Sequence, residues 1–215
     1  MKLFFKTQKQ LIPIATLAII ASIVSVFFLD QKICQFIADP SRKDDLYSNF
    51  RTLTDIGLAE PYFLAGLIGL IAARFFLKKE SRLKTKLYEF SVSLLASLIA
   101  CGIVTHLFKF IIGRGRPHLT EDYSATLFEP FNYHWHFHSM PSGHSQVMFT
   151  AATVLSTQIP QLKIFWFSFA AIICFSRIAT LNHFLSDTIL GAFIGYSISL
   201  FTLYKLEQRR LIKGS

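Results

Sequence analysis

Three ionisable side chains, Arg177, His183 and Asp187, lie in a short stretch (residues 176–187) between two long apolar segments. A charge placed between apolar segments is costly and often marks a working site. His183 and Asp187 stand four residues apart, so on a helix they share one face at about 5–6 Å between Cβ atoms. A carboxylate there accepts one imidazole proton and leaves the lone pair of the other nitrogen facing outward. This pattern indicates a histidine nucleophile or base, and the alternative is a charged helix end at a membrane surface.

A second group, residues 141–144, reads Pro-Ser-Gly-His and precedes another apolar run. Pro followed by Ser is typical of a helix start, and Gly143 lets backbone amides approach a ligand closely. The free N–H groups of a helix N-terminus form a ready site for a phosphate group. His144 then lies beside that phosphate, placed to give a proton to a leaving oxygen. The alternative is a capping Ser142 beside an incidental histidine.

Three cations, Lys109, Arg114 and Arg116, are concentrated where a further apolar run ends. Lys109 and Arg116 are seven residues apart, about two helical turns, and would share a face if the helix continued. The two glycines and the proline within residues 113–117 predict instead that the helix unwinds there. Alternatively, these long side chains reach out to the phosphates of membrane lipids. For Arg114 we favour that alternative.

The three groups together match one family pattern in residue type, order and spacing. They resemble the tripartite signature of the type-2 phosphatidic acid phosphatase superfamily, which includes membrane lipid phosphate phosphatases, bacterial acid phosphatases and vanadium haloperoxidases. The resemblance covers residues 87–205 directly and implies an all-α core bundle similar to the acid phosphatase/vanadium haloperoxidase fold. The matching residues are Lys109-x6-Arg116-Pro117, Pro141-Ser142-Gly143-His144 and Ser176-Arg177-x5-His183-x3-Asp187.

The resemblance also implies a role for each matching residue. His183 would attack phosphorus to form a phosphohistidine, Asp187 would orient it, and His144 would protonate the departing lipid oxygen. Phosphoryl transfer requires mainly the placement of groups and the stabilisation of spread charge, which suits a cage of cations at a helix end. We expect no metal and no cofactor, because the sequence shows no carboxylate cluster suited to magnesium. The residues expected to hold the phosphate oxygens are Lys109, Arg116, Ser142, Gly143 and Arg177.

The composition is that of a membrane protein. The chain has 215 residues, 52% apolar side chains, 23 Phe and a mean hydropathy of +0.44, which is too apolar for an ordinary soluble domain. Its net charge of +9 does not indicate nucleic-acid binding, because the cations flank apolar runs instead of forming one basic stripe. Three cysteines without paired spacing indicate neither a disulfide framework nor a zinc site.

Six apolar runs predict six transmembrane helices in a single polytopic domain, residues 1–215. The first run is long and lacks a small-residue cleavage site, so we expect it to remain as a transmembrane helix and not to be a signal peptide. Residues 30–60 are polar and are expected to form an external loop, in which weak periodicity allows a short interfacial helix. The six runs comprise residues 11–29, 62–77, 87–112, 145–159, 162–178 and 184–204.

Clusters of lysine and arginine orient these helices. Residues 78–86 carry five cations opposed by one glutamate, and residues 205–213 carry four more cations. Positive clusters of this kind mark the cytoplasmic side of a membrane protein. With both termini in the cytoplasm, six helices place the 113–141 loop and the turn before His183 at the outer face. The three groups that could perform chemistry are therefore predicted to meet at that face.

The segment 134–138 alternates histidine with aromatic residues in the outer loop, as a metal-binding strand does. Aromatic and histidine side chains at a bilayer surface are ordinarily interfacial anchors. We therefore favour anchoring, or contact with a substrate headgroup, over metal binding by His134, His136 and His138.

These observations predict an integral membrane phosphatase that removes a terminal phosphate from a lipid at the outer (periplasmic) face of a bacterial inner membrane. Candidate substrates are undecaprenyl diphosphate, phosphatidylglycerophosphate, phosphatidic acid and the phosphates of lipid A. Membrane lipids are the expected partners, nucleic acid is not, and no oligomeric state is indicated. One alternative is a lipid phosphotransferase that passes the phosphoryl group to an alcohol. Another is a non-enzymatic lipid-binding or transport protein, which leaves His144 and the His183–Asp187 spacing unexplained.

Overall fold

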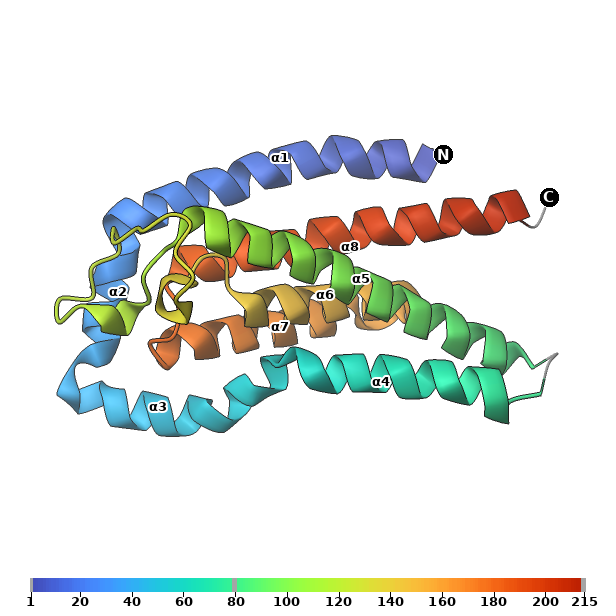
Figure 1. The fold of residues 1–215 in the computed structure, drawn as a ribbon, viewed down its shortest axis with the longest axis horizontal. Coiled ribbons are helices and arrows are strands. Elements are labelled where there is room, and N and C mark those ends of the chain that lie inside the picture. Colours follow the sequence, from blue (N-terminus) through green and yellow to red (C-terminus); the bar gives the residue numbers. More distant parts are fainter. Residues whose placement is uncertain (1, 79–80, 214–215) are drawn as a thin grey trace.

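The structure is a computed structural model that describes residues 2–78 and 81–213, with side chains for residues 11–78 and 81–209. It forms an elongated bundle whose helices run mostly along the long axis (Figure 1). Within these residues the regular structure is helical, apart from an isolated bridge that pairs Arg114 with Phe128. The predicted all-α fold is confirmed.

The N-terminal part of the chain runs along the bundle, across one end, and partly back. The first helix passes through a π-helical turn into a short helix that lies across the end of the bundle, and a third helix follows on the other side (Figure 1). These elements are α1 (Lys2–Val24), the π-helical turn Ser25–Leu29, α2 (Asp30–Ala38), α3 (Pro40–Thr54) and a short 3-10 turn (Asp55–Gly57).

The external loop expected at residues 30–60 is almost wholly helical, so that expectation was wrong. The start of α3 explains part of the difference. The Asp39 carboxylate accepts a hydrogen bond from the backbone N–H of Ser41 at 2.9 Å, which caps the helix. Pro40 occupies the first helical position, where its missing N–H leaves no bond unmade. These local signals start a helix that the weak apolar periodicity of the segment had allowed.

The next two helices form an antiparallel hairpin: α4 (Ala59–Ile71), extended by a π-helical turn (Ala72–Phe76), and α5 (Arg82–Ile112). Glycines on α4 let the two backbones approach closely. A Cβ atom added at Gly69 would lie 2.4 Å from the Ser91 hydroxyl on α5. Small residues have this function at helix interfaces in membranes, where close packing is the main source of association.

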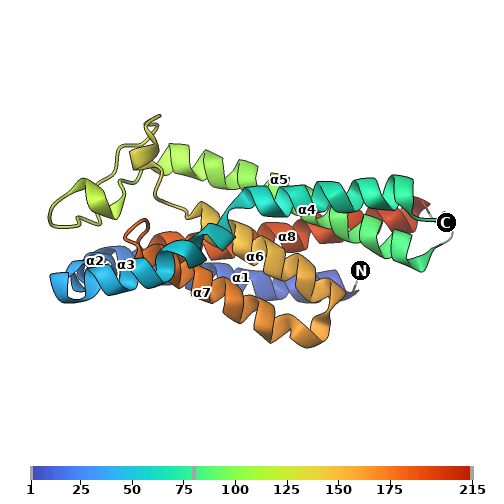
Figure 2. The same ribbon diagram turned by 90° about the horizontal axis from the view of Figure 1, so that it is seen from below.

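The remaining three helices, α6 (Gly143–Gln158), α7 (Lys163–Ala179) and α8 (Leu185–Lys213), form the core of the bundle. Figure 2 shows α6 running beside α7 and α8. Two glycines of α8 make this contact close. A Cβ atom at Gly191 would lie 2.3 Å from the Ser142 carbonyl oxygen, and one at Gly195 would lie 2.4 Å from that of Gln146. The start of α6 is therefore held directly against the first turns of α8.

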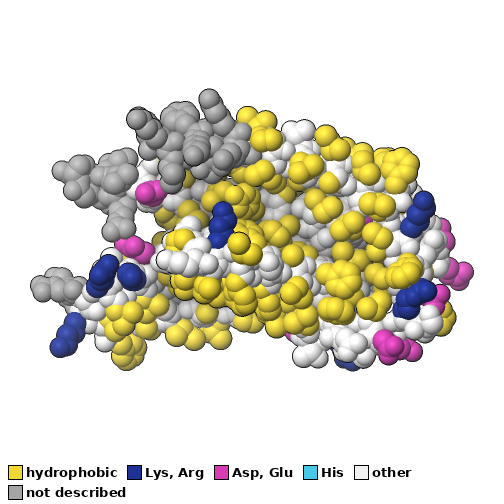
Figure 3. Space-filling model, turned by 180° about the vertical axis from the view of Figure 1, so that it is seen from behind, with side chains coloured by type: hydrophobic (Ala, Val, Ile, Leu, Met, Phe, Trp, Pro, Cys, Tyr) yellow, Lys and Arg dark blue, Asp and Glu magenta, His cyan; other side chains and the backbone are white. Residues whose placement is uncertain are grey.

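Five helical segments are long and apolar enough to cross a membrane. The predicted fourth run, 145–159, is the helix α6, which has 16 residues and is not among the five. In Figure 3, apolar side chains cover the flank of the molecule, and most charged side chains lie towards its two ends. The chain is thus a polytopic helical membrane protein, although α6, at 16 residues, is too short to count among its candidate membrane spans. The segments are Leu11–Ala38, Pro40–Phe76, Arg82–Ile112, Pro160–Ala179 and Leu185–Arg209.

The bundle separates its termini from its longest loop. Both termini lie at the end where α4 turns into α5, whereas the 113–142 segment and the turn between α7 and α8 lie at the opposite end (Figure 1). The three groups of candidate residues therefore meet at one end of the bundle, as predicted. Part of each cation cluster used for the orientation argument, including Lys79 and the side chains of residues 210–213, lies outside the described residues.

Candidate active site

The end of α5 places two of the candidate cations. Lys109 lies in the last turn, and the helix stops at Ile112 because Gly113 adopts a left-handed conformation with φ +57°. A Cβ atom at Gly113 would lie 1.7 Å from the carbonyl oxygen of Glu129, so only glycine fits beneath the returning loop. Arg116 follows in extended backbone with φ −78° and ψ 155°. The predicted unwinding of the helix is confirmed.

The helix start that residues 141–144 predicted is the N-terminus of α6. Ser142 is the N-cap, and its hydroxyl oxygen accepts a hydrogen bond from the Ser145 N–H at 3.4 Å. The Ser142 N–H donates to the Asp187 carbonyl at 2.9 Å, which fixes the helix start against α8. No atom lies within 4 Å of a Cβ atom added at Gly143. The side of α6 on which Gly143 lies therefore faces open space.

His183 and Asp187 are brought together, although not on one helix as the spacing suggested. α8 begins at Leu185, so His183 lies in the preceding turn and Asp187 in the first turn of the helix. The Asp187 carboxylate reaches back to accept the Phe184 N–H at 2.9 Å, as in a capping box. The same oxygen, Oδ2, lies 3.5 Å from Nδ1 of His183. This leaves Nε2 of His183 as the nitrogen available for chemistry.

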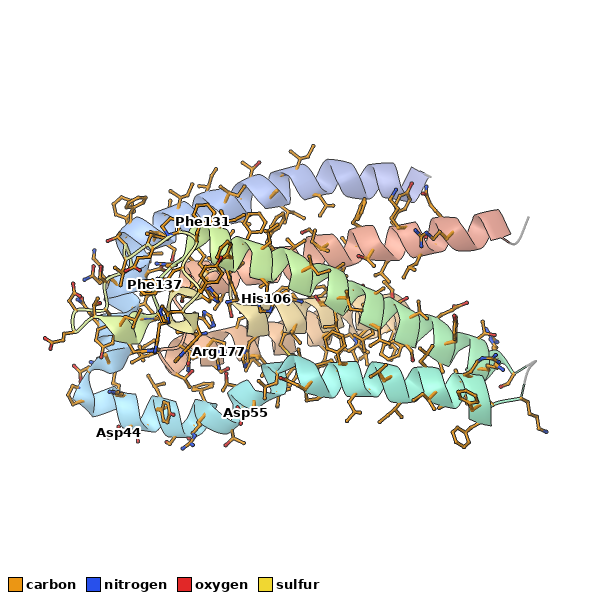
Figure 4. The ribbon with its side chains drawn as sticks, viewed as in Figure 1. Asp44, Asp55, His106, Phe131, Phe137 and Arg177 are labelled. Atoms are coloured by element: carbon orange, nitrogen blue, oxygen red, sulfur yellow. The ribbon has the colours of Figure 1, made fainter. Side chains whose placement is uncertain are left out.

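Three cations surround this pair without any carboxylate partner within 4.0 Å among the described residues. Lys109 donates to the His138 carbonyl at 2.5 Å, Arg116 to the Asn182 carbonyl at 3.2 Å, and Arg177 to the Thr54 hydroxyl at 2.8 Å. Figure 4 shows Arg177 at the end of the bundle that carries the loops. Lys109 and Arg177 are each only 7% exposed, and Nε of Arg177 is buried without a hydrogen-bond partner. Buried cations without counter-ions are costly, so the arrangement calls for an anion.

Burial and the nearby cations lower the pKa of both histidines. Burial lowers the pKa of His183 well below its usual 6.5, Arg116 and Lys109 lower it further, and Asp187 opposes the shift. His183 is therefore neutral near pH 7, the form in which an imidazole attacks an electrophile. Burial lowers the pKa of His144 to about 3, with further lowering by Arg177, Arg116 and Lys109. An anion bound among these cations would offset the part of this shift that the cations cause.

Arg114 does not reach lipid phosphates, so the interpretation favoured from the sequence was wrong. The side chain is 0% exposed. Its guanidinium lies 2.6 Å from a carboxylate oxygen of Asp187 and 2.8 Å from one of Asp30. The bend of the chain after Gly113, bridged to Phe128, turns this side chain inward. Sequence reasoning missed its partner Asp30. The signal that could have found it is a carboxylate directly at the end of the first apolar run.

The histidine-rich segment, residues 134–138, contacts two of the candidate cations through its backbone carbonyl groups. The described residues contain no group of His, Cys, Asp or Glu side chains that could hold a metal ion. The His138 carbonyl accepts from Lys109, and the His136 carbonyl accepts the backbone N–H of Arg116 at 2.9 Å. Ser139 follows in the same loop, donates its hydroxyl to Asp187 at 2.6 Å and lies 3.5 Å from Nδ1 of His183. Sequence reasoning missed Ser139, because a serine in a loop carries no distinguishing pattern.

A cavity of about 400 Å³ opens beside these residues, between α4 and α5. Lys109, Gly143 and His144 line its inner side. The rest of the lining is mainly apolar and includes Phe63, Leu98 and Ile99. A Cβ atom at Gly102, which also lines the cavity, would meet no atom within 4 Å. Of the three cations, Lys109 lines the cavity, which extends from the start of α6 between α4 and α5.

Comparisons with known proteins agree with this geometry. The profile of the PAP2 superfamily matches residues 90–211. Two curated relatives are the lipid A 1-phosphatases of Rhizobium etli and Rhizobium johnstonii. Each is 31% identical to this chain, over 109 and 106 residues, which are 51% and 49% of this chain and 47% and 43% of the relative. The chain thus spans about half the length of the curated relatives it matches.

Two solved structures have a similar fold. LpxE of Aquifex aeolicus is 24% identical, with a TM-score of 0.60 over 82% of this chain and 95% of that chain. A transmembrane PAP2 type phosphatidylglycerolphosphate phosphatase of Bacillus subtilis is 18% identical, with a TM-score of 0.64 over 93% and 96% of the two chains. The architecture of the bundle is therefore that of membrane PAP2 phosphatases.

Proposed function

We propose, because this chain belongs to the PAP2 superfamily, that it is a membrane phosphatase that removes a terminal phosphate group from a lipid. The observation that carries the proposal is the set of three cations, Lys109, Arg116 and Arg177, gathered around His183 and the start of α6 without a carboxylate partner among the described residues. A phosphate monoester supplies the missing negative charge and enough oxygen atoms to accept their N–H groups. The names of the curated relatives, both lipid A 1-phosphatases, support the same activity.

In the proposed reaction His183 is the nucleophile. Its Nε2 attacks phosphorus, the N–P bond forms as the bond from phosphorus to the lipid oxygen breaks, and His144 gives that oxygen a proton. Asp187 holds the proton on Nδ1 and stabilises the positive charge that develops on the ring. Water then attacks the phosphohistidine, His144 takes a proton from it, and free phosphate leaves with His183 restored.

The phosphate oxygens carry the charge that the site must stabilise. The three cations and the backbone N–H of Gly143 are the proposed donors, with the Ser142 hydroxyl beside them. The hydroxyl oxygen of Ser142 already accepts the Ser145 N–H, so its proton remains available for a phosphate oxygen. Donors held in place before the reaction stabilise a spread negative charge without further reorganisation. Each bond to a charged group contributes about 1.5–3 kcal/mol.

The cavity between α4 and α5 supports a lipid as the substrate. Its lining includes His144 and Lys109 and is mainly apolar along α4 and α5. A lipid whose phosphate lies among the cations can place the start of its tails in this cavity while the rest remains in the bilayer. Candidate substrates are lipid A phosphates, phosphatidylglycerophosphate, phosphatidic acid and undecaprenyl diphosphate. Because the end of α4 and the start of α5, where Lys78 and Arg82 are found, lie at the end of the bundle opposite the site, we place the site at the outer face of a bacterial inner membrane, with both termini in the cytoplasm.

The first test measures phosphate release by the purified protein from a panel of phosphorylated lipids in detergent. We expect release from at least one lipid and none above background from His183→Ala. A His183→Ala variant that is folded and hydrolyses lipid at a near-normal rate would remove the proposed nucleophile.

A second test separates a lipid substrate from a small soluble one. Gly102→Phe fills the cavity between α4 and α5, and Ile103→Phe on the next residue, which is 65% exposed, is the matched control. We expect Gly102→Phe to reduce hydrolysis of the lipid and to leave hydrolysis of p-nitrophenyl phosphate close to that of Ile103→Phe. Equal loss of both activities would show that the cavity does not accommodate the lipid.

A further inference from the structure

A buried carboxylate lies at the outer end of the first apolar helix, far in sequence from every signature motif. Asp30 begins α2 directly after the π-helical turn Ser25–Leu29 and is 0% exposed. It precedes the part of the chain that the family profile matches, residues 90–211. A buried charge within an apolar segment is costly and is retained where it has a partner and a function. Turns of this π-helical type occur often at functional sites.

Both oxygens of Asp30 are fully engaged. Oδ1 accepts the Ser25 hydroxyl at 2.6 Å and the backbone N–H of Ser186 at 3.1 Å. Oδ2 accepts the Ser186 hydroxyl at 2.5 Å and the Arg114 guanidinium at 2.8 Å. Ser186 lies in the first turn of α8, so Asp30 satisfies an N–H group that the helix itself leaves unpaired. The carboxylate therefore joins the first helix of the chain to the turn that carries Asp187.

Arg114 bridges the two carboxylates in one orientation. Nη1 donates to Asp187 Oδ1 at 2.6 Å and Nη2 to Asp30 Oδ2 at 2.8 Å, while Nε and Nη2 also donate to the Ala125 carbonyl at 3.1 and 2.7 Å. Its Cζ lies 4.1 Å from the centre of the Phe184 ring. A planar group with donors in several directions can make these bonds at once, and a lysine cannot.

Because of this bridge, the two oxygens of the Asp187 carboxylate have different partners. Oδ1 is held by Arg114, while Oδ2 accepts the Ser139 hydroxyl and the Phe184 N–H and faces Nδ1 of His183. Fixing one oxygen sets the direction in which the other points. From this arrangement we infer that Asp30 and Arg114 are positioning residues, which hold Asp187 so that it orients His183 for the proposed phosphatase reaction.

The charges of the three groups explain why two carboxylates are present. Arg114 alone would neutralise Asp187 and weaken it as an acceptor for the His183 proton. With Asp30 included, two negative charges surround one positive charge, and the cluster keeps a net charge of −1 opposite His183. That residual charge stabilises the ring as it becomes positive during attack on phosphorus. Asp30 thus acts on the reaction through Arg114, without contact with the substrate.

The decisive variant is Asp30→Asn, which keeps the shape of the side chain and removes its charge. We expect kcat to fall about tenfold, equivalent to about 1.4 kcal/mol, while KM changes by less than about threefold, because the phosphate-binding cations are untouched. Two controls match it: Ser25→Ala removes a hydrogen bond from Asp30 without changing charge, and Asp44→Asn removes an exposed carboxylate on α3. Both controls should stay within about twofold of wild-type kcat.

The double variant Asp30→Asn/Arg114→Gln separates positioning from a purely structural role. Because Asp30 acts through Arg114, its loss should have little further effect once Arg114 is gone, so kcat of the double variant should be close to that of Arg114→Gln alone, whereas independent effects would make it lower than either single variant. Wild-type kcat in Asp30→Asn, or a loss confined to thermal stability with kcat per folded molecule unchanged, would overturn the inference. So would strictly additive losses in the double variant.

A readout without turnover keeps this test separate from that of the proposed function. The ¹⁵N NMR signals of the His183 ring report which nitrogen carries the proton and how strongly it is hydrogen-bonded. We expect the Nδ1–H form in the wild type and a weakened Nδ1 hydrogen bond in Asp30→Asn. A wild type that hydrolyses no phospholipid refutes the phosphatase proposal, whereas identical ring signals in the two proteins refute the positioning role of Asp30.

Discussion

Arg114 and Arg116 are separated by a single residue, yet they lie in opposite electrostatic environments. Arg114 is fully buried between the carboxylates of Asp30 and Asp187, with its remaining donors on a carbonyl and a hydroxyl. Arg116 is partly exposed, donates to the Asn182 carbonyl at 3.2 Å, and has no carboxylate within 4.0 Å among the described residues. Arg114 therefore belongs to a closed network, in which each charged group has an oppositely charged partner. Arg116 belongs to an open network, in which the cation is hydrogen-bonded to neutral groups.

This difference shows how the site divides its charges. The closed side, formed by Asp30, Arg114 and Asp187, has every charge paired and holds the carboxylate behind His183. The open side, formed by Arg116 with Lys109 and Arg177, has cations whose hydrogen bonds go to neutral groups among the described residues. Paired buried charges stabilise a geometry, whereas unpaired ones raise the free energy of the empty site and are relieved when an anion binds. The two sides should therefore respond differently to substitution.

The largest expected effect is on folding, from Arg114→Ala. This change leaves two buried carboxylates without their cation, and breaking such a pair destabilises a protein by roughly 3–5 kcal/mol. Thermal unfolding of the purified protein in detergent measures the loss, with Arg42→Ala on the exposed surface as the control. Wild-type stability in Arg114→Ala would mean that the closed network contributes nothing to the fold.

The next effect is on activity, from Arg116→Ala. Loss of a charge-assisted hydrogen bond to phosphate should lower kcat/KM by roughly 10- to 150-fold, since such bonds contribute about 1.5–3 kcal/mol. The thermal stability should change little, because no ion pair is broken. A variant that loses stability as much as Arg114→Ala would show that the two arginines do not differ as the structure indicates.

A smaller effect is expected from an anion that resembles the reacting phosphorus. Vanadate should inhibit the enzyme and, at about 100 times its Kd, stabilise the folded protein by about 2.7 kcal/mol. The stabilisation should fall to about 0.3–1.4 kcal/mol in Arg116→Ala at the same concentration, and chelators should leave activity unchanged. Inhibition by chelators that zinc reverses would instead support metal binding by the histidines of residues 134–138.

The smallest expected effect is a shift in the pH dependence of kcat/KM. The pKa of His183 lies well below 6.5, so the attacking neutral form persists as the pH falls through that value, and the acid limb of kcat/KM lies below it. Arg116→Ala removes one of the cations that lower this pKa, so the pKa rises and the acid limb moves to higher pH. The unfolded chain binds a proton at His183 near pH 6.5 while the folded chain does not, so this residue reduces stability as the pH falls further. An acid limb that Arg116→Ala shifts to lower pH would contradict this account.

Local patterns in the sequence were enough to locate the helices and the candidate residues. The apolar runs coincide with α1 and with α4 to α8, and Gly113 ends α5 at the expected place. Ser142 caps α6 as the Pro-Ser-Gly-His pattern predicted. These features depend on interactions within one or two turns of the chain, which residue type and spacing describe directly. For residues 30–54 the weak apolar periodicity indicated at most a short interfacial helix within a loop, whereas the segment is helical almost throughout.

The sequence by itself determined which residues could perform chemistry and that they would gather at one end of a membrane bundle. The tertiary structure alone decided which charges were paired. Arg114 and Asp30 are 84 residues apart, and the Ser139 hydroxyl meets Asp187 across 48 residues. The energy of a buried charge depends on the atoms around it, which come from distant parts of the chain. Two arginines with nearly the same neighbours in sequence can therefore differ completely in partners and in function.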